Sequence, residues 1–342
     1  MIKQEEAFKE RCKARGLDEA QTEEALAFIG EFEKAYASAG MDMENITPEE
    51  MKEYVGDLLK QRKNEEGRIL ALARYSYLLK NEPVYLLFTQ IFGSYGVLPS
   101  IAERAKQLAG EGIGEELFKG IEVPPLGSLP EAFPPVVQEM MARMASRLPS
   151  ELCRKILAGN HHGIPASAFD EERARYEKAS SVDEYLKDRH ARMVDELQQH
   201  CDENKLWYEQ KITQRVVDFV KSNQELLSAV REGDTLYVTK IPYNPDKYLT
   251  ESDPLIKRYL ACHCPLAAST ILKEGAVVPP TWCYCSAGYE KTLFDNVFGE
   301  SLEVEVKQSV LDGSERCRFA ISLGTLLSCQ ATFSHTLCQE AS

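Results

Sequence analysis

The residues best suited to chemistry lie near the end of the 342-residue chain, where cysteines and a histidine stand at short spacings. They are Cys262, His263, Cys264, Cys283, Cys285 and Cys317. The first four cysteines form two C-x-C pairs, and His263 lies inside the first pair. A tetrahedral zinc site needs four sulfur or nitrogen ligands at about 2.0–2.3 Å, so these six residues are candidate metal ligands.

A reactive thiol is a second interpretation of the same residues. Cys264 directly precedes Pro265, which predicts a helix over 265–273 with Cys264 at its start. Backbone N–H groups and the helix dipole at that position stabilise a thiolate, and His263 is a candidate catalytic partner of Cys264. A third interpretation is that most of these cysteines are simply buried as small hydrophobic residues. The sequence leaves all three open.

Two other polar features are interpreted as structural. His161 and His162 lie in a turn between Asn160 and Pro165, where turn contacts account for them. Lys240 ends a predicted strand just before Ile241-Pro242, a place from which functional side chains often project. We nevertheless favour a structural role for Lys240.

Composition limits the classes of partner. The net charge is −14, which is poorly suited to a nucleic-acid backbone, and 44% of the residues are hydrophobic, as in an ordinary globular protein. No stretch looks like the roughly 20 apolar residues of a membrane helix, and the N-terminus does not resemble a signal peptide. We therefore expect a cytoplasmic protein, whose thiols stay reduced, with no nucleic-acid or membrane partner.

The chain divides by pattern into three parts. Residues 1–122 read as a helical domain, with a capped helix start at Thr47-Pro48-Glu49-Glu50. Residues 123–135 are rich in proline and predict a linker. Residues 136–342 begin with helices and end in an α+β region.

The α+β region is predicted from a change in local pattern after residue 233. Strands are expected over 235–241 and 281–285, and a hairpin over 302–323 turns at Asp312-Gly313. A strand at 281–285 would place the thiols of Cys283 and Cys285 on one face. Helices are expected over 255–260 and 287–298. The predicted fold class is α+β, mostly helical and then a small antiparallel sheet.

The last sixty residues resemble the 4-vinyl reductase domain and the related 2-amino-thiazoline-carboxylate hydrolase family. The resemblance is carried by Cys285-Ser286-Ala287-Gly288-Tyr289 and by a G-x-x-x-C-x-F ending at Gly313, Cys317 and Phe319. Residues 150–325 also look like an uncharacterised bacterial family with K-I-P-Y, C-H-C-P and C-x-C-S-A-G patterns.

The 4-vinyl reductase resemblance implies a domain that binds a small aromatic molecule beside a structural zinc. Its first and last cysteine ligands match Cys285 and Cys317. Its glutamate and second cysteine would fall on Val306 and Ser309, which cannot serve. Cys262, His263, Cys264 or Cys283 would have to complete the site.

The N-terminal segment resembles the SAM-like arm of tyrosine recombinases around Ile46-Thr47-Pro48-Glu49 and Tyr54-Val55. Acidic residues outnumber basic residues over 1–100, so we interpret this arm as a packing or homodimerisation element rather than a DNA-binding one.

Three functions follow as expectations. The first is a protein that binds a small organic ligand, with a zinc site bracing the C-terminal domain. The alternative is a hydrolase acting on C–N or C–S bonds, through zinc-bound water or through Cys264 with His263. An interaction scaffold built on the helical arm is the third.

Overall fold

The computed structural model describes residues 2–272 and 277–324, which form two compact units. The first unit comprises Met1–Tyr95 and Val123–Phe133, and the second comprises Gly96–Glu122 and Pro134–Ser342. This division differs from the predicted one at 1–122, 123–135 and 136–342. Most of the proline-rich segment packs with the first unit, and residues 96–122 belong to the second.

The first unit is built from helices in its described residues. They are α1 (Glu5–Ala14), α2 (Glu19–Tyr36), η1 (Ala37–Ala39), α3 (Pro48–Lys60), α4 (Glu66–Leu78), α5 (Glu82–Ser94) and η2 (Pro130–Ala132). The predicted helix start is confirmed at α3: the Glu50 N–H donates to Thr47 Oγ1 at 3.3 Å, and the Thr47 N–H donates to Glu50 Oε2 at 2.8 Å. These two bonds satisfy backbone donors that the first helical turn leaves unpaired.

The proline-rich segment contributes to the core of the first unit, which explains why it is not a free linker. Leu126 is buried in the same cluster as Val55, and its carbonyl accepts a 2.8 Å hydrogen bond from Asn64 Nδ2. Gly127 has a φ of 95°, and a Cβ there would lie 3.2 Å from the Val55 side chain. Proline excludes regular structure but does not prevent packing.

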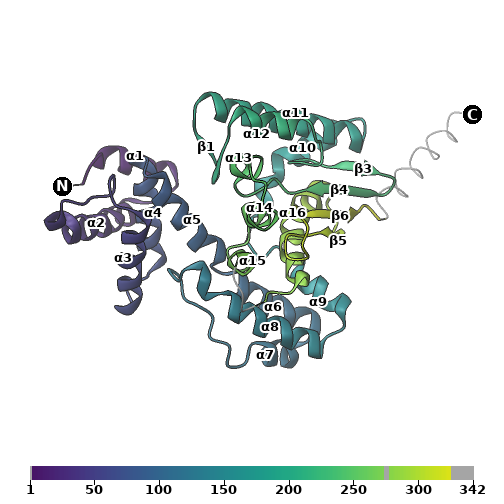
Figure 1. Cartoon of the computed structure of the whole chain (residues 1–342), viewed down its shortest axis with the longest axis horizontal. Helices are drawn as coiled ribbons and strands as arrows, with labels where there is room; N and C mark the ends of the chain where they lie inside the picture. The colour runs from purple at the N-terminus through teal and green to yellow at the C-terminus, as the bar shows by residue number, and fades with distance from the viewer. Residues whose placement is uncertain (1, 273–276, 325–342) are drawn as a thin grey trace, which may run out of the picture. The chain divides into compact units, whose positions relative to one another are not determined.

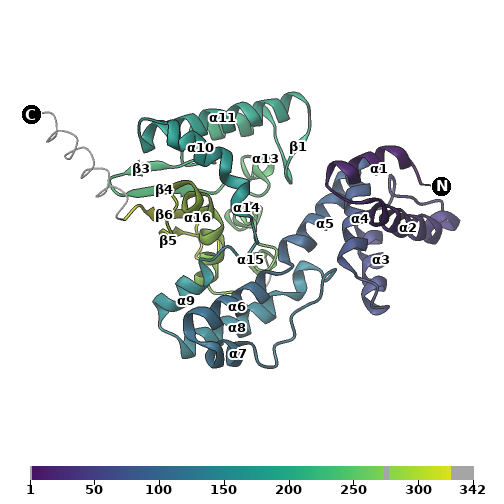
Figure 2. The ribbon, with the colours of Figure 1, turned by 180° about the vertical axis from the view of Figure 1, so that it is seen from behind.

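The helices of the second unit surround a small sheet. They are α6 (Val97–Ala109), α7 (Glu111–Phe118), α8 (Pro134–Arg147), α9 (Ser150–Leu157), η3 (Ala166–Phe169), α10 (Asp170–Lys178), α11 (Val182–Asp202), α12 (Gln214–Lys221), α13 (Pro245–Tyr248), α14 (Pro254–Ala261), α15 (Ser269–Leu272), η4 (Pro280–Cys283) and α16 (Tyr284–Phe298). Figures 1 and 2 show α11 running along the β3 side of the sheet, while α16 contacts β5.

The sheet confirms the predicted α+β class. It is antiparallel in the order β3-β4-β6-β5, with β3 at Val230–Glu232, β4 at Thr235–Thr239, β5 at Glu303–Gln308 and β6 at Arg318–Ser322. Leu236 pairs with Ile321 and Val238 with Phe319, so one face is apolar. Leu236, Val238 and Ile321 pack with apolar side chains of α11 and α16. A separate hairpin, β1 (Leu206–Trp207) and β2 (Gln210–Lys211), follows α11.

One stretch of the described residues, Glu82–Ala109, is long and apolar enough to cross a membrane by length and composition alone. It is two helices, α5 and α6, interrupted at Gly96 with a φ of 77°. Phe88 is buried in the first unit and Ile101 in the second, each at 0% exposure. Apolar side chains buried inside protein are typical of the core helices of a soluble protein.

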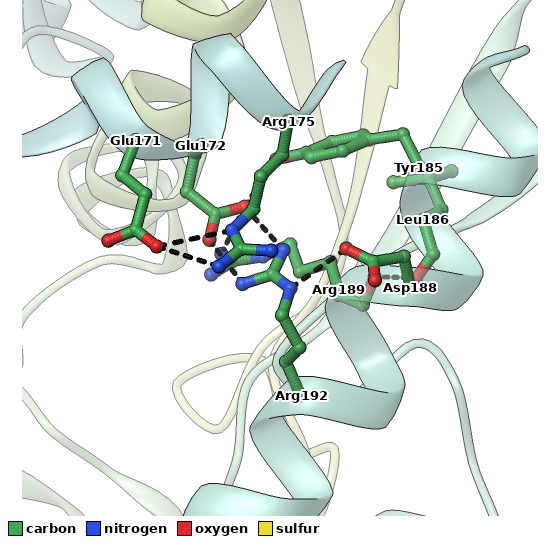
Figure 3. Close-up of polar contacts among 9 residues, drawn as sticks. Glu171, Glu172, Arg175, Tyr185, Leu186, Asp188, Arg189 and Arg192 are labelled. Atoms are coloured by element: carbon green, nitrogen blue, oxygen red, sulfur yellow. Dashed lines mark hydrogen bonds and ion pairs between the residues drawn. The ribbon is translucent and has the colours of Figure 1, made fainter. Parts of the chain in front are cut away.

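A charged cluster joins α10 to α11 within the second unit (Figure 3). Arg192 donates two hydrogen bonds to the Glu172 carboxylate, at 2.7 and 3.1 Å, and Arg189 forms an ion pair with it at 3.0 Å. The Tyr185 hydroxyl donates a further bond at 2.9 Å. Burial alone would raise the pKa of Glu172, but Arg192, Arg189 and Tyr185 outweigh it and lower the pKa to about 2.

This lowered pKa predicts a pH-dependent contribution to stability. A carboxyl whose folded pKa lies below its ordinary 4.5 stabilises the fold above pH 4.5, and the contribution is lost as the pH falls from 4.5 towards 2. We expect Glu172→Gln to lower the free energy of unfolding by about 3 kcal/mol at pH 7. The difference from the wild type should shrink steadily below pH 4.5, as measured by urea unfolding.

Glu171→Gln is the matched control. Glu171 is the neighbouring residue on α10 and pairs with Arg175 at 2.7 Å, but its side chain is 79% exposed. Exposed ion pairs contribute little to stability, so this variant should unfold like the wild type at pH 7 and at pH 3. Equal losses in the two variants, or a loss in Glu172→Gln that is the same at pH 7 and pH 3, would contradict the assignment.

Candidate functional site

The cysteines predicted as site residues are placed by four short segments of the second unit. Cys262 directly follows α14, Cys264 lies in the turn after it, and Cys317 precedes β6. Cys283 ends η4, and Cys285 is the second residue of α16. All five are free thiols.

Of two elements predicted here, the strand is wrong and the helix is confirmed only over α15, and the last residue of the predicted helix, Lys273, lies outside the described residues. The strand expected over 281–285 is a 3-10 turn that continues into α16. Pro279-Pro280 fixes helix-compatible φ angles at its start, and the following Cys-Ser-Ala-Gly-Tyr-Glu segment packs as a helix. The helix expected over 265–273 is a turn followed by the four-residue α15. Cys283 and Cys285 therefore do not share a strand face, because residues two apart on a helix point about 200° apart.

Four of the thiols form one electrostatic group. In each pair drawn from Cys262, Cys264, Cys283 and Cys317, the charge of one sulfur raises the pKa of another. Burial is the larger cause and raises the pKa of all four thiols above the usual range. Cys285 differs, because Cys264 is the only thiol that raises its pKa. Without a metal, these sulfurs are therefore protonated near neutral pH.

The predicted metal site is tested by the arrangement of these donors. Four neighbouring thiols, three of them buried and Cys264 half-buried, have the chemistry that zinc prefers. However, over residues 2–272 and 277–324, no group of three or more Cys, His, Asp or Glu side chains is arranged to hold a metal ion. The sulfurs thus gather in one region without forming a finished coordination shell, and zinc binding stays a prediction.

Cys264 and His263 form hydrogen bonds with other groups rather than with each other. His263 Nε2 lies 2.5 Å from the Ile241 carbonyl oxygen, so this nitrogen is assigned as the donor. Burial lowers the His263 pKa to about 3. The Trp282 indole N–H donates to Cys264 Sγ at 3.2 Å, yet burial raises the Cys264 pKa overall. A thiolate–imidazolium pair needs the opposite shifts in both residues.

Lys240 is the side chain that sequence reasoning undervalued. Its backbone N–H donates to the Cys317 carbonyl at 2.9 Å, continuing the β4–β6 pairing beyond the strand end. Its ammonium lies 3.2 Å from Ser286 Oγ, 3.5 Å from Glu290 Oε1 and 4.7 Å from the centre of the Tyr289 ring. We call these four residues the Lys240 centre. The signal in the sequence was a lysine directly after a strand, together with the i, i+3, i+4 spacing of Ser286, Tyr289 and Glu290.

The charge state of Lys240 follows from its neighbours. The side chain is 13% exposed, and its burial alone would lower the pKa. Glu290, Tyr289, Cys317 and Cys264 act in the other direction and raise the pKa overall. Lys240 is therefore an ammonium at neutral pH, suited to binding negative charge and unsuited to acting as a base or a Schiff-base nucleophile.

The two histidines at 161 and 162 separate into different roles. His161 is 4% exposed, and its ring nitrogens contact Ser100 Oγ at 3.0 Å and the Ile156 carbonyl at 2.8 Å, so its predicted structural role is supported. His162 instead packs edge-on against Tyr289, with ring centres 5.3 Å apart. Its ring keeps exposure to solvent, yet the surrounding protein lowers its pKa to about 4, and the Lys240 charge adds to that effect.

Gly288 brings His162 and Tyr289 together. A Cβ at Gly288 would lie 2.5 Å from the Ala158 carbonyl carbon and 2.7 Å from the Gly159 oxygen, so α16 touches this backbone directly. The glycine of the Cys-Ser-Ala-Gly-Tyr pattern is thus required by close packing. His162 follows Gly159 by three residues.

Comparisons with known proteins give one match. Residues 244–327 match a family model described as "Family of unknown function (DUF6144)". The matched segment contains the five cysteines and α16, and it begins just after Lys240. Searches of curated proteins and of solved structures found no match. The resemblance to the 4-vinyl reductase group therefore stays a prediction.

The electrostatic link between Lys240 and His162 is directly measurable. Removing a nearby positive charge favours the protonated imidazole, so Lys240→Met should raise the His162 pKa from about 4. The measurement is the pH dependence of the ring nitrogen and carbon shifts by NMR, with Lys221→Met, at the exposed last residue of α12, as the control. An unchanged His162 pKa in Lys240→Met would show that the ammonium does not lie beside this ring.

Proposed function

We propose that the second unit binds a small organic molecule carrying an anionic group, and that the Lys240 centre is the binding site. The single observation that supports this is the state of the Lys240 ammonium. It has three donors, a hydrogen bond to Ser286 at 3.2 Å, and a carboxylate of Glu290 at 3.5 Å, beyond good hydrogen-bonding distance. A carboxylate, sulfonate or phosphate on a ligand would complete its coordination.

Aromatic rings beside the charge support the same proposal. The Tyr289 face contacts the ammonium, and the Tyr289 side chain keeps 40% of its surface exposed. Exposed aromatic surface next to a largely buried cation suits a ligand that has both a flat apolar part and a charged group. We also propose that the protein is cytoplasmic and has no nucleic-acid partner. Homodimerisation through the first unit is a further prediction.

The hydrolase is the second candidate, and one observation favours it. Cys264 Sγ accepts a hydrogen bond from the Trp282 indole, and the backbone N–H groups of Leu266 and Ala267 also act to lower the Cys264 pKa, which favours a thiolate. Burial nevertheless raises the Cys264 pKa more than these groups lower it. His263 is a weak proton acceptor for the thiol, because its pKa is lowered to about 3. Ligand binding therefore accounts for more of the geometry than nucleophilic attack does.

A pair of fluorescent probes tests the Lys240 centre. The anionic probe is 1-anilinonaphthalene-8-sulfonate, and N-phenyl-1-naphthylamine is its neutral counterpart without the sulfonate. We expect Lys240→Met to weaken binding of the sulfonate probe by about tenfold or more, because a charge-assisted hydrogen bond is lost. Binding of the neutral probe should change little in fluorescence titrations.

Lys221→Met is the control for loss of a lysine charge, since Lys221 is exposed at the end of α12. It should leave both titrations as in the wild type. Equal affinity of wild type and Lys240→Met for the sulfonate probe would refute the proposed site, as would failure of the wild type to bind either probe.

We further propose that the four grouped thiols, rather than Cys285, hold the zinc that the sequence predicts. When bound, zinc would supply a structural crosslink among the segments that carry Cys262, Cys264, Cys283 and Cys317. The support is the chemistry of four thiols, three buried and one half-buried, in each pair of which one sulfur raises the pKa of the other.

Metal analysis of protein purified under reducing conditions without chelator distinguishes the role of Cys283 from that of Cys285. We expect about one zinc per chain in the wild type and in Cys285→Ser, and strongly reduced zinc in Cys283→Ser. Loss of a structural metal couples to folding, so Cys283→Ser should also lower the free energy of unfolding by several kcal/mol. Wild-type protein without zinc would remove the metal and leave four free thiols.

A further inference from the structure

The Lys240 centre contains two opposite charges side by side. The Lys240 ammonium lies 3.5 Å from Glu290 Oε1 and 3.2 Å from Ser286 Oγ. Ser286 and Glu290 are four residues apart on α16, so their side chains lie on one face of the helix, one turn apart. Ser286 and Tyr289 add no charge near neutral pH. The centre therefore has one positive group and one negative group within direct reach of each other.

Each of these charges keeps bonding capacity that its partner does not use. A separation of 3.5 Å is longer than a good hydrogen bond between an ammonium and a carboxylate, which is about 2.7–2.9 Å. Among residues 2–272 and 277–324, the Lys240 ammonium is the one partner of the Glu290 carboxylate in an ion pair or hydrogen bond. The two side chains are 13% and 22% exposed, so both charges are open to a molecule that arrives from solvent.

The Glu290 carboxylate limits which anions the centre binds well. An anion bound to Lys240 lies close to Glu290 as well, and like charges repel strongly where protein replaces part of the solvent. A ligand with a positive group beside its anionic group avoids this repulsion, because the positive group pairs with Glu290. Such a ligand is complementary to both charges, whereas a lone anion is complementary to one.

We propose that the Lys240 centre binds the charged end of an α-amino acid, with the carboxylate on Lys240 and the ammonium on Glu290. This inference rests on the proposed function and names the class of its ligand. One carbon atom separates the two charged groups of an α-amino acid, so they lie close together, as Lys240 and Glu290 do. The exposed surface of Tyr289 lies beside the pair and is available to the amino acid side chain.

Displacement of the sulfonate probe by three related molecules tests this assignment. L-Phenylalanine has both charged groups, hydrocinnamate lacks the ammonium, and phenethylamine lacks the carboxylate. We expect the inhibition constant of L-phenylalanine on the wild type to be about tenfold lower than that of either other molecule, because L-phenylalanine alone pairs with both charges. Inhibition constants allow for any change in affinity for the probe itself.

Glu290→Gln distinguishes recognition of the ammonium from a structural role. This variant should bind L-phenylalanine about tenfold more weakly, because the charged partner of the ammonium is lost. It should bind hydrocinnamate more tightly, because the repulsion of a lone anion is lost as well. A purely structural role would weaken both acids together. Glu300→Gln removes an exposed carboxylate just after α16 and should leave all three inhibition constants as in the wild type.

The outcomes separate this inference from the proposed function. If Lys240→Met weakens the sulfonate probe but the two acids displace it equally well from the wild type, the anion site stands and the amino acid assignment is overturned. The assignment is also overturned if neither acid displaces the probe, or if Glu290→Gln weakens both acids equally. If Lys240→Met has no effect, or if the wild type binds neither fluorescent probe, the proposed function and this inference fail together.

Discussion

The second unit depends on one close contact between helix α16 and the backbone after α9. At Gly288 the helix lies against Ala158 and Gly159 at a distance that leaves no room for a side chain. That contact fixes the rotation of α16 about its axis. Its apolar residues Phe294 and Val297 then face the sheet, while Ser286, Tyr289 and Glu290 face Lys240. A single packing constraint therefore orients both the core and the candidate site.

Burial has opposite effects on the two kinds of titratable group around Lys240. It raises the pKa of the thiols and lowers that of His263, so both kinds are neutral near pH 7. The Lys240 ammonium keeps its charge because Glu290 and the other neighbours offset the cost of desolvation. A lysine that stays charged beside protonated thiols and a neutral imidazole suits recognition of an anion better than it suits nucleophilic chemistry.

The thiol group and the Lys240 centre share structural elements. The Cys317 carbonyl accepts a hydrogen bond from the Lys240 backbone N–H, and Cys283 ends the η4 turn that leads directly into α16. A metal crosslink among the sulfurs would therefore hold the strand end and the start of α16 in fixed positions. The Glu172 cluster has a comparable role farther away, where it ties α10 to α11 and leaves α11 to anchor the hairpin through Glu196.

The sequence by itself determined the features that depend on local chemistry. The Thr47 and Glu50 cap, the helix over 255–260, the Asp312-Gly313 hairpin and the α+β class follow from residue types at short spacings, and the structure confirms them. The sequence also predicted that the cysteines lie in one region, and four of the thiols affect one another's pKa there, while their function stays a prediction. The environment of Lys240 could not be predicted, because a lysine after a strand has the same local pattern whether its side chain is exposed or enclosed by other residues.

Only the tertiary structure decided which residues meet. Local propensity could not show that Cys283 and Cys285 lie on a turn and a helix, since packing against distant segments selects that conformation over a strand. Nor could it place Leu126 of the proline-rich segment in the first core, or bring His162, Lys240 and Tyr289 together across more than a hundred residues. Those contacts depend on close packing at Gly288 and on desolvation, which are properties of the folded chain rather than of any short stretch of it.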